Sequence, residues 1–168
     1  MKLRITYYII GCLLGGLFFP SCGQIEVPSD FELIEADRPL ILAYAEANNL
    51  DGLFNFQGVY VVTETEGDTA TSFPSSSSRV DLLYQGSLLT GEVFNSTASD
   101  SLRTPAGEWP RLSELISGLE SGVKLFRKGG RGTLIIPSAL AYEEHGSTDG
   151  KVPPNAILRF DFELVDFE

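Results

Sequence analysis

The sequence predicts an α+β domain in which a twisted antiparallel sheet wraps around one short amphipathic helix, preceded by an extra N-terminal helix. Three observations support this fold class. Strand-like segments outnumber helical ones, tight turns separate several of them, and a single central segment carries an apolar stripe at helical spacing. The length of 168 residues leaves room for a leader and one domain of ordinary size.

Residues 1–21 are interpreted as a secretory leader. Lys2 and Arg4 precede an apolar run over residues 5–19. As a helix this run would be about 22 Å long, shorter than the ~30 Å hydrocarbon core of a bilayer. The sequence therefore favours a cleaved signal over a permanent membrane span.

Both cysteines, Cys12 and Cys22, lie in or at the end of this leader, so neither a disulfide framework nor a thiolate metal site is expected in the folded domain. The segment Phe-Pro-Ser-Cys at 19–22 resembles the lipobox of bacterial lipoproteins, and we expect Cys22 to be lipidated. Cys12 has the better local match, but cleavage there would leave an apolar core of only about seven residues. Cleavage by an ordinary signal peptidase, which would leave Cys22 as a free thiol, is the alternative.

The chain is acidic, with a formal net charge of −11 at pH 7, and loss of the leader would remove two positive charges and no negative one. A domain of this charge is repelled by phosphate backbones, so nucleic acid is not an expected partner. We expect an extracytoplasmic monomer that a lipid anchor holds at a bacterial membrane. Of the two bacterial membranes, we favour the outer one.

The N-terminal part is predicted to hold no chemistry. Residues 22–36 are polar and are expected to form a tether, followed by a helix and linker over 37–58. Asp37 is the expected helix cap, Pro39 falls in the first turn, and helix-forming residues continue to Ala47. We expect this helix to serve packing alone.

The main domain is predicted over 59–168 and consists largely of strands. Its expected strands are 59–63, 80–88, 92–94, 132–137 and 158–164, and the last of these alternates with Leu158, Phe160, Phe162 and Leu164 facing inward. Residues 72–78, which include four consecutive serines, and residues 95–109 are predicted loops, and the serine-rich one shows nothing that would make it rigid. The glycine-rich segment 129–132 is predicted to be a turn.

The apolar stripe that defines the central helix consists of Leu112, Leu115, Ile116, Leu119, Val123 and Phe126. Two starting points remain open, at Leu112 or near Ser117. We favour the later start, and Gly118 weakens a helix from either one.

Several chemistries have no support in the residues. His145, the only histidine, lies among charged residues in a predicted loop, and no triad or nucleophile elbow is visible. The carboxylates match no calcium loop, so no metal or cofactor is expected. Asp161 and Glu163 share a strand face and are interpreted as solvated charges.

Four segments resemble the FK506-binding-protein family of peptidyl-prolyl isomerases in their order and spacing. They are Tyr-Gln-Gly at 84–86 with Phe-Asn-Ser at 94–96, Glu-Leu-Ile-Ser-Gly-Leu at 114–119, Ile-Pro-Ser-Ala-Leu-Ala-Tyr at 136–142, and Val-Pro-Pro-Asn-Ala at 152–156 with Phe-Asp-Phe-Glu-Leu at 160–164. The resemblance implies a proline-binding pocket between the sheet and the helix. It further implies that the catalytic residues are Phe94, Asn95, Ile116 and Tyr142. The substrate-binding residues that it implies are Tyr84, Leu115, Leu119, Val152 and Phe160.

The implied roles make chemical sense. Prolyl rotation is slow because resonance stiffens the C–N bond, with a barrier of ~18–20 kcal/mol. Resonance separates charge, so a dry pocket disfavours the planar form. The Ile116 N–H and the Tyr142 hydroxyl would hold the flanking carbonyls, and lowering the barrier by ~5 kcal/mol would accelerate rotation several thousand-fold.

The chain departs from the family pattern at four positions. It has Asn95 where the family has an aspartate and Leu119 where the family has an aromatic residue at the floor of the pocket. It also has Ala106 near a position where an aromatic residue is common, and Glu143 where the family has a glycine. Asn95 is expected to hydrogen-bond Tyr142 without supplying charge, which predicts reduced activity.

The resulting hypothesis is a lipid-anchored prolyl isomerase that assists the folding of exported, proline-containing polypeptides. The alternative is a catalytically weak module of the same fold that binds partner proteins or nascent chains. An unrelated β-rich lipoprotein that binds a small ligand is a third interpretation, and it leaves the spacing of Tyr142 and the two prolines unexplained.

Overall fold

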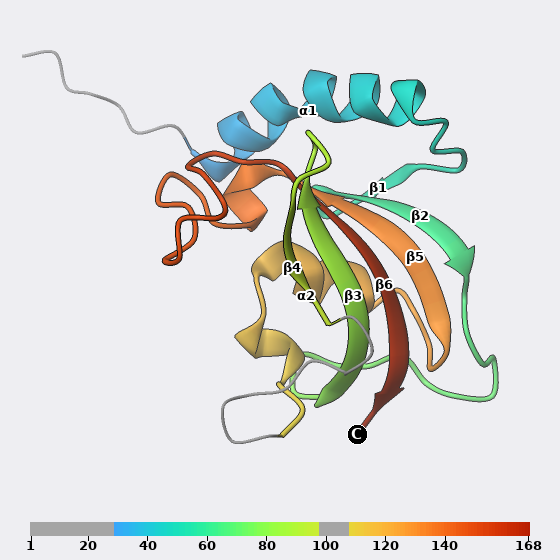
Figure 1. Cartoon of the computed structure of the whole chain (residues 1–168). Coiled ribbons are helices and arrows are strands. Elements are labelled where there is room, and N and C mark those ends of the chain that lie inside the picture. Colours follow the sequence, from blue (N-terminus) through green and yellow to red (C-terminus); the bar gives the residue numbers. More distant parts are fainter. Residues whose placement is uncertain (1–28, 98–107) are drawn as a thin grey trace, which may run out of the picture.

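The computed structural model describes residues 29–97 and 108–168, so the leader with Cys12 and Cys22, and also Ala106, lie outside the described residues. Within them, one antiparallel sheet has the strand order β1-β2-β5-β6-β3-β4 (Figure 1). The strands are β1 (Phe54–Phe56), β2 (Val59–Thr65), β3 (Val80–Leu88), β4 (Val93–Ser96), β5 (Gly130–Ile136) and β6 (Leu158–Phe167). The helices are α1 (Asp30–Ala47) and α2 (Ser117–Val123), with 3₁₀ turns η1 (Leu112–Glu114) and η2 (Ser138–Leu140). The predicted α+β architecture with an extra N-terminal helix is confirmed.

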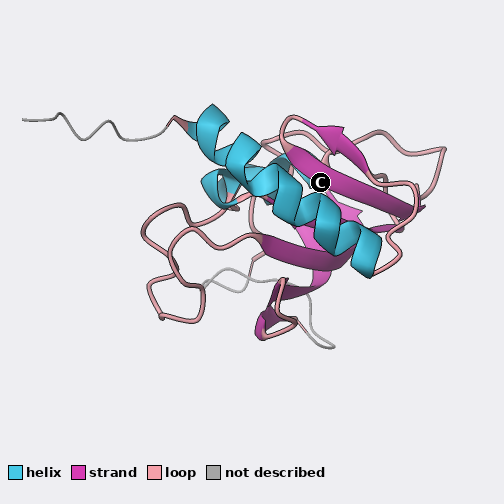
Figure 2. Ribbon diagram, turned by 90° about the horizontal axis from the view of Figure 1, so that it is seen from above, coloured by secondary structure: helices cyan, strands magenta, loops and turns pink. Residues whose placement is uncertain are grey.

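The sheet packs on both faces because successive strand side chains point to opposite sides. On one face, α2 and the strands enclose the main core, to which Val59, Val61 and Leu134 contribute. On the other face, Ile41 of α1 packs with Tyr60 and Ile135 in a second, smaller cluster. Helix α1 runs across the strands near one end of the sheet (Figure 2).

Helix α1 begins earlier than the sequence analysis predicts. Its cap is Ser29 rather than Asp37, so residues 30–36 are helical and do not belong to a tether. The Ser29 hydroxyl accepts a hydrogen bond from the Glu32 N–H, and the Glu32 carboxylate accepts one from the Ser29 N–H at 2.8 Å. This reciprocal pair satisfies two N–H groups at the helix start, and Pro39 consequently lies inside the helix.

The predicted strands are present with shifted boundaries, but β1 was missed, because it lies within the segment 37–58 that was predicted as helix and linker. The alternation in β6 is confirmed, since Leu158, Phe160, Phe162 and Leu164 are all buried. Asn95 and Ser96 belong to β4 rather than to a loop. Residues 130–132 belong to β5, so the predicted glycine-rich turn is wrong there and extends no further than Gly129.

The later start of the central helix is confirmed, since α2 begins at Ser117 with Ile116 as its cap. The earlier part of the apolar stripe, from Leu112, forms the separate 3₁₀ turn η1. Leu115 joins the two in an extended conformation, which bends the chain between them.

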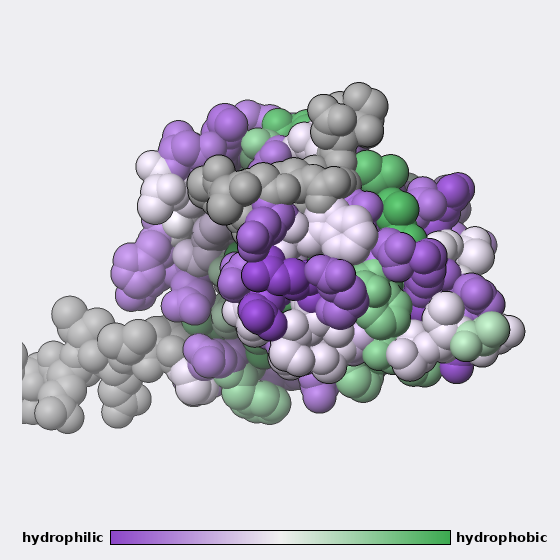
Figure 3. Space-filling view, turned by 90° about the horizontal axis from the view of Figure 1, so that it is seen from below, coloured by the Kyte–Doolittle hydropathy of each residue, from purple (hydrophilic) through white to green (hydrophobic). Residues whose placement is uncertain are grey.

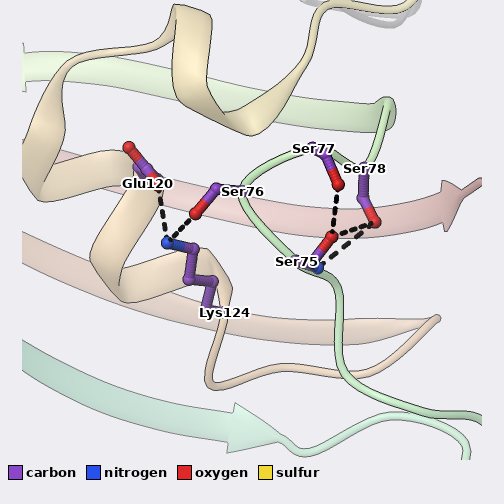
Figure 4. Close-up of polar contacts among 6 residues, drawn as sticks. All are labelled: Ser75, Ser76, Ser77, Ser78, Glu120 and Lys124. Atoms are coloured by element: carbon purple, nitrogen blue, oxygen red, sulfur yellow. Dashed lines mark hydrogen bonds and ion pairs between the residues drawn. The ribbon is translucent and has the colours of Figure 1, made fainter.

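The serine-rich loop is more ordered than its composition suggests (Figure 4). The Lys124 ammonium donates to Ser76 and to Glu120, both at 2.6 Å, which ties the loop to α2. The Ser75 hydroxyl lies 3.0 Å from that of Ser77, and the Ser76 carbonyl accepts from the Ser113 N–H. The loop therefore supports η1, which leads directly to the start of α2.

The face of the molecule that is seen from below is mostly hydrophilic, with hydrophobic residues in small groups between the polar ones (Figure 3). Among the described helices, none combines the length and the apolar character needed to cross a bilayer.

Candidate functional site

A cavity of about 270 Å³ lies between the sheet and α2. It brings together the side chains singled out in the sequence with one exception, Val152, which is 2% exposed and belongs to the main core instead. Glu114 also lines the cavity and was missed, although it immediately precedes Leu115 in the sequence. The lining residues are Tyr84, Phe94, Asn95, Glu114, Leu115, Ile116, Leu119, Tyr142 and Phe160.

Three aromatic rings form one wall of the cavity. The Phe160 ring meets the Phe94 ring edge to face, with centroids 5.6 Å apart at 80°, and lies 5.6 Å from the Tyr84 ring. Gly86 pairs with Phe160 across β3 and β6 and with Asn95 across β3 and β4. A Cβ atom at Gly86 would come within 2.6 Å of Phe94 Cζ and 3.0 Å of Phe160 Cε1. Glycine at this position therefore lets the two phenylalanine rings meet over the strand.

Helix α2 supplies the opposite side. Leu119 is buried, and Ile116 caps the helix in an extended conformation. No acceptor for the Ile116 N–H is found among residues 29–97 and 108–168. The first N–H groups of a helix have no partner within it, so this donor is available to a ligand in the cavity.

Two phenols supply further polar groups to the cavity. Burial raises the pKa of Tyr84, the nearby Tyr142 raises it further, and a hydrogen bond with the Asn95 side chain partly offsets this. Burial also raises the pKa of Tyr142, as does the negative charge of Asp149. Both hydroxyls therefore keep their protons at neutral pH. Asn95 interacts with Tyr84 and not, as predicted, with Tyr142.

The loop between Tyr142 and Val152 is closed by short-range hydrogen bonds. The Ser147 hydroxyl donates to Asp149 at 2.7 Å and accepts from the Val152 N–H at 2.8 Å. Hydrogen bonds from Ser147 and Lys151 lower the pKa of Asp149 to about 2, so this carboxylate is charged near Tyr142 at neutral pH. His145 is exposed in the same loop.

The outward-facing acids of β6 are engaged in ion pairs. Asp161 lies 2.8 Å from Arg159 and accepts from the Thr133 hydroxyl at 2.7 Å, and Glu163 lies 3.0 Å from Arg131. Within the described parts of the chain, no group of three or more His, Cys, Asp or Glu residues could hold a metal ion. What the cavity offers is a largely apolar surface with the Ile116 N–H and two tyrosine hydroxyls as neutral donors and with Glu114 as the one acidic residue of its lining, which suits holding and desolvating a ligand.

Comparison with known proteins agrees with this arrangement. The sequence profile of the FKBP-type peptidyl-prolyl cis-trans isomerases matches residues 70–165, more than half of the chain. The chain belongs to this family. Its β2 strand and α1 helix precede the matched segment.

Individual relatives support the family assignment. The chain is 40% identical over 111 residues to the peptidyl-prolyl cis-trans isomerase FKBP1A of Xenopus laevis, which covers 66% of this chain and 99% of that protein. It is 36% identical over 110 residues to the isomerase FkpA of Escherichia coli K12, which covers 64% of this chain. The chain spans about a third of the length of the FkpA relatives that it matches.

The fold is also similar to that of a solved relative. The crystal structure of FkpA from Escherichia coli superimposes with a TM-score of 0.67 at 26% identity, over 83% of this chain and 62% of that chain. This similarity reaches beyond the segment that the family profile matches.

Proposed function

We propose that the chain is a peptidyl-prolyl cis-trans isomerase acting on proline-containing polypeptides. The observation that carries the proposal is the cavity itself, in which buried Phe94, Leu119 and Phe160 meet the Tyr142 hydroxyl and the Ile116 N–H, for which the described part of the chain offers no acceptor. Family membership supports the same activity.

Rotation of a prolyl bond requires no bond to break. In the proposed mechanism, the proline ring sits against the aromatic wall, where water is excluded. The planar amide is the more polar form, so desolvation raises its free energy relative to the twisted form and lowers the barrier. The Ile116 N–H and the Tyr142 hydroxyl hold carbonyls on the substrate backbone while the rest of the peptide turns about the bond.

The test is cis/trans exchange of a short Leu-Pro peptide, followed by NMR with the chain from residue 23 onward. We expect the unmodified chain to accelerate exchange and the double variant Tyr142→Phe, Phe94→Ala to abolish the acceleration. Tyr44→Phe, which removes a hydroxyl from α1 outside the cavity, is the matched control and should remain active. An inactive double variant beside an active control would assign catalysis to the cavity, whereas equal activity in all three proteins would exclude it.

A second candidate function is a binding module with little turnover. The observation that favours it is the Asn95 side chain, which is uncharged and, within residues 29–97 and 108–168, makes no hydrogen bond to Tyr142. In the same experiment, peptide line broadening without accelerated exchange would support this alternative.

We further propose that the protein is extracytoplasmic, lipid-anchored through Cys22, and monomeric, and that exported proteins are its substrates. The support is the leader sequence with its lipobox-like ending, and the acidic charge of the remaining chain. Metabolic labelling with palmitate in a bacterial host should label the full chain and not Cys22→Ser. Equal labelling of both proteins, or of neither, would contradict the anchor.

A further inference from the structure

Asp37 of α1 is linked to the cavity through a series of hydrogen bonds, which runs from its side chain to the backbone on either side of Tyr142. Its carboxylate oxygen Oδ2 accepts two hydrogen bonds from Ser138, one from the backbone N–H at 2.8 Å and one from the hydroxyl at 2.7 Å. Ser138 is only 1% exposed. A charged acceptor with two short bonds to one buried residue fixes that residue more firmly than a neutral contact would.

Ser138 in turn holds both neighbours of Tyr142. Its carbonyl accepts from the Ala141 N–H at 3.1 Å and from the Glu143 N–H at 3.0 Å. Glu143 has a φ of 52°, a left-handed conformation that residues with a side chain rarely adopt. The Glu143 carbonyl also accepts from the Asn155 N–H at 2.7 Å, which helps to hold this conformation. The backbone on either side of Tyr142 thus depends on where Ser138 lies.

The same turn is also linked to the other polar group of the cavity. The Ser117 hydroxyl at the start of α2 donates to the Leu140 carbonyl at 3.2 Å. Ile116, whose N–H is unpaired among the described residues, directly precedes Ser117. The 3₁₀ turn η2, which lies beneath α1 in Figure 1, therefore connects to both donors proposed to hold the substrate.

We propose that Asp37 is a positioning residue for catalysis: from a helix outside the family-matched segment, it holds Ser138 so that the Tyr142 hydroxyl stays in place at the cavity. This inference rests on the proposed isomerase function. If Asp37 has this role, α1 contributes to catalysis through the Asp37 carboxylate as well as to packing.

A purely structural role for Asp37 makes a different prediction, because α1 has a second polar attachment to the rest of the domain, this one to the sheet. The Tyr44 hydroxyl accepts from Arg159 Nη1 at 3.1 Å, on the other face of β6 from the cavity residue Phe160. If Asp37 merely fastens the helix, Tyr44→Phe should have the same consequences as Asp37→Ala. If Asp37 positions Tyr142, only Asp37→Ala should affect catalysis.

The experiment measures kcat and KM for the Leu-Pro peptide with the unmodified chain, Asp37→Ala, Tyr44→Phe, Tyr142→Phe and the double variant Asp37→Ala, Tyr142→Phe. We expect Asp37→Ala to lower kcat about tenfold with little change in KM, in keeping with the cost of misplacing a reacting group. In the Tyr142→Phe background, Asp37→Ala should have no further effect, since the hydroxyl that it positions is already absent. The Ala141 and Glu143 amide resonances should shift in Asp37→Ala and not in Tyr44→Phe.

Two results would overturn the inference. One is a full additional loss from Asp37→Ala in the Tyr142→Phe background, and the other is an equal loss of kcat in Tyr44→Phe. If Asp37→Ala does not fold, Asp37→Asn replaces it in the comparison of single and double variants. Asparagine keeps the shape of the side chain and one acceptor oxygen but removes the negative charge. If the unmodified chain is inactive, the proposed function fails, while the amide shifts still decide whether Asp37 positions the backbone around Tyr142.

Discussion

Replacing Phe160 by alanine is expected to lower the free energy of unfolding by about 3–5 kcal/mol and to abolish catalysis. The ring is 3% exposed and contacts both Phe94 and Tyr84, so its loss opens a void in the main core and removes the centre of the aromatic wall. Urea unfolding followed by far-UV circular dichroism measures the first effect, and peptide exchange measures the second.

Phe162→Ala is the matched control for this variant. Phe162 lies two residues further along β6 on the same face, is 5% exposed, and packs edge to face on Phe126 with centroids 4.9 Å apart. It does not line the cavity. We expect a similar loss of stability but near-normal exchange per folded molecule. A Phe160→Ala protein that loses less than about 1.5 kcal/mol, or a Phe162→Ala protein equally defective in exchange, would contradict this assignment.

Gly118→Ala is expected to destabilise the protein by about 1–2 kcal/mol, although alanine is the better helix former. A Cβ atom at this position would overlap Ile136 Cγ2 and would lie 3.0 Å from the Leu140 carbonyl oxygen. Overpacking of this kind costs about 1–3 kcal/mol or more, which outweighs the gain of ~1 kcal/mol in helix propensity. To relieve the overlap, α2 must move away from β5, and the Ile116 N–H moves with it.

We therefore expect Gly118→Ala to weaken peptide binding as well as stability, as measured by urea unfolding and by peptide titration. Ser121→Ala on the same helix is the control, because it changes propensity without adding an atom. If Gly118→Ala were instead more stable than the unmodified chain, the close approach of α2 to β5 would not be a constraint on the fold.

The sequence was most informative where local pattern and tertiary packing agree. The alternation of β6 follows from one buried face. The start of α2 at Ser117 agrees with the role that the family resemblance implies for the Ile116 N–H, whereas the apolar stripe alone pointed to Leu112. The cavity residues were found through the family resemblance rather than from periodicity, because aromatic and aliphatic residues in a pocket look the same as core residues in a sequence.

The errors have specific physical causes. The Ser29–Glu32 capping pair was visible in the sequence, but Asp37 and Pro39 suggested a later helix start, whereas the helix begins at the Ser29 cap and continues through Pro39. The burial of Val152 depends on how a long loop returns to the sheet, which local spacing does not determine. The contact of Asp37 with Ser138 spans 101 positions and has no local signal.

The strand order has a consequence for what counts as the domain. Strand β2 pairs along β5, and its Val59 and Val61 are completely buried, yet both precede the segment that the family profile matches. A polypeptide cut at the start of that segment would leave β5 with a bare edge and would uncover Ile135 on the face that α1 protects. The smallest portion that could be transplanted into another protein is therefore longer than the segment that the family profile matches, because it includes β2.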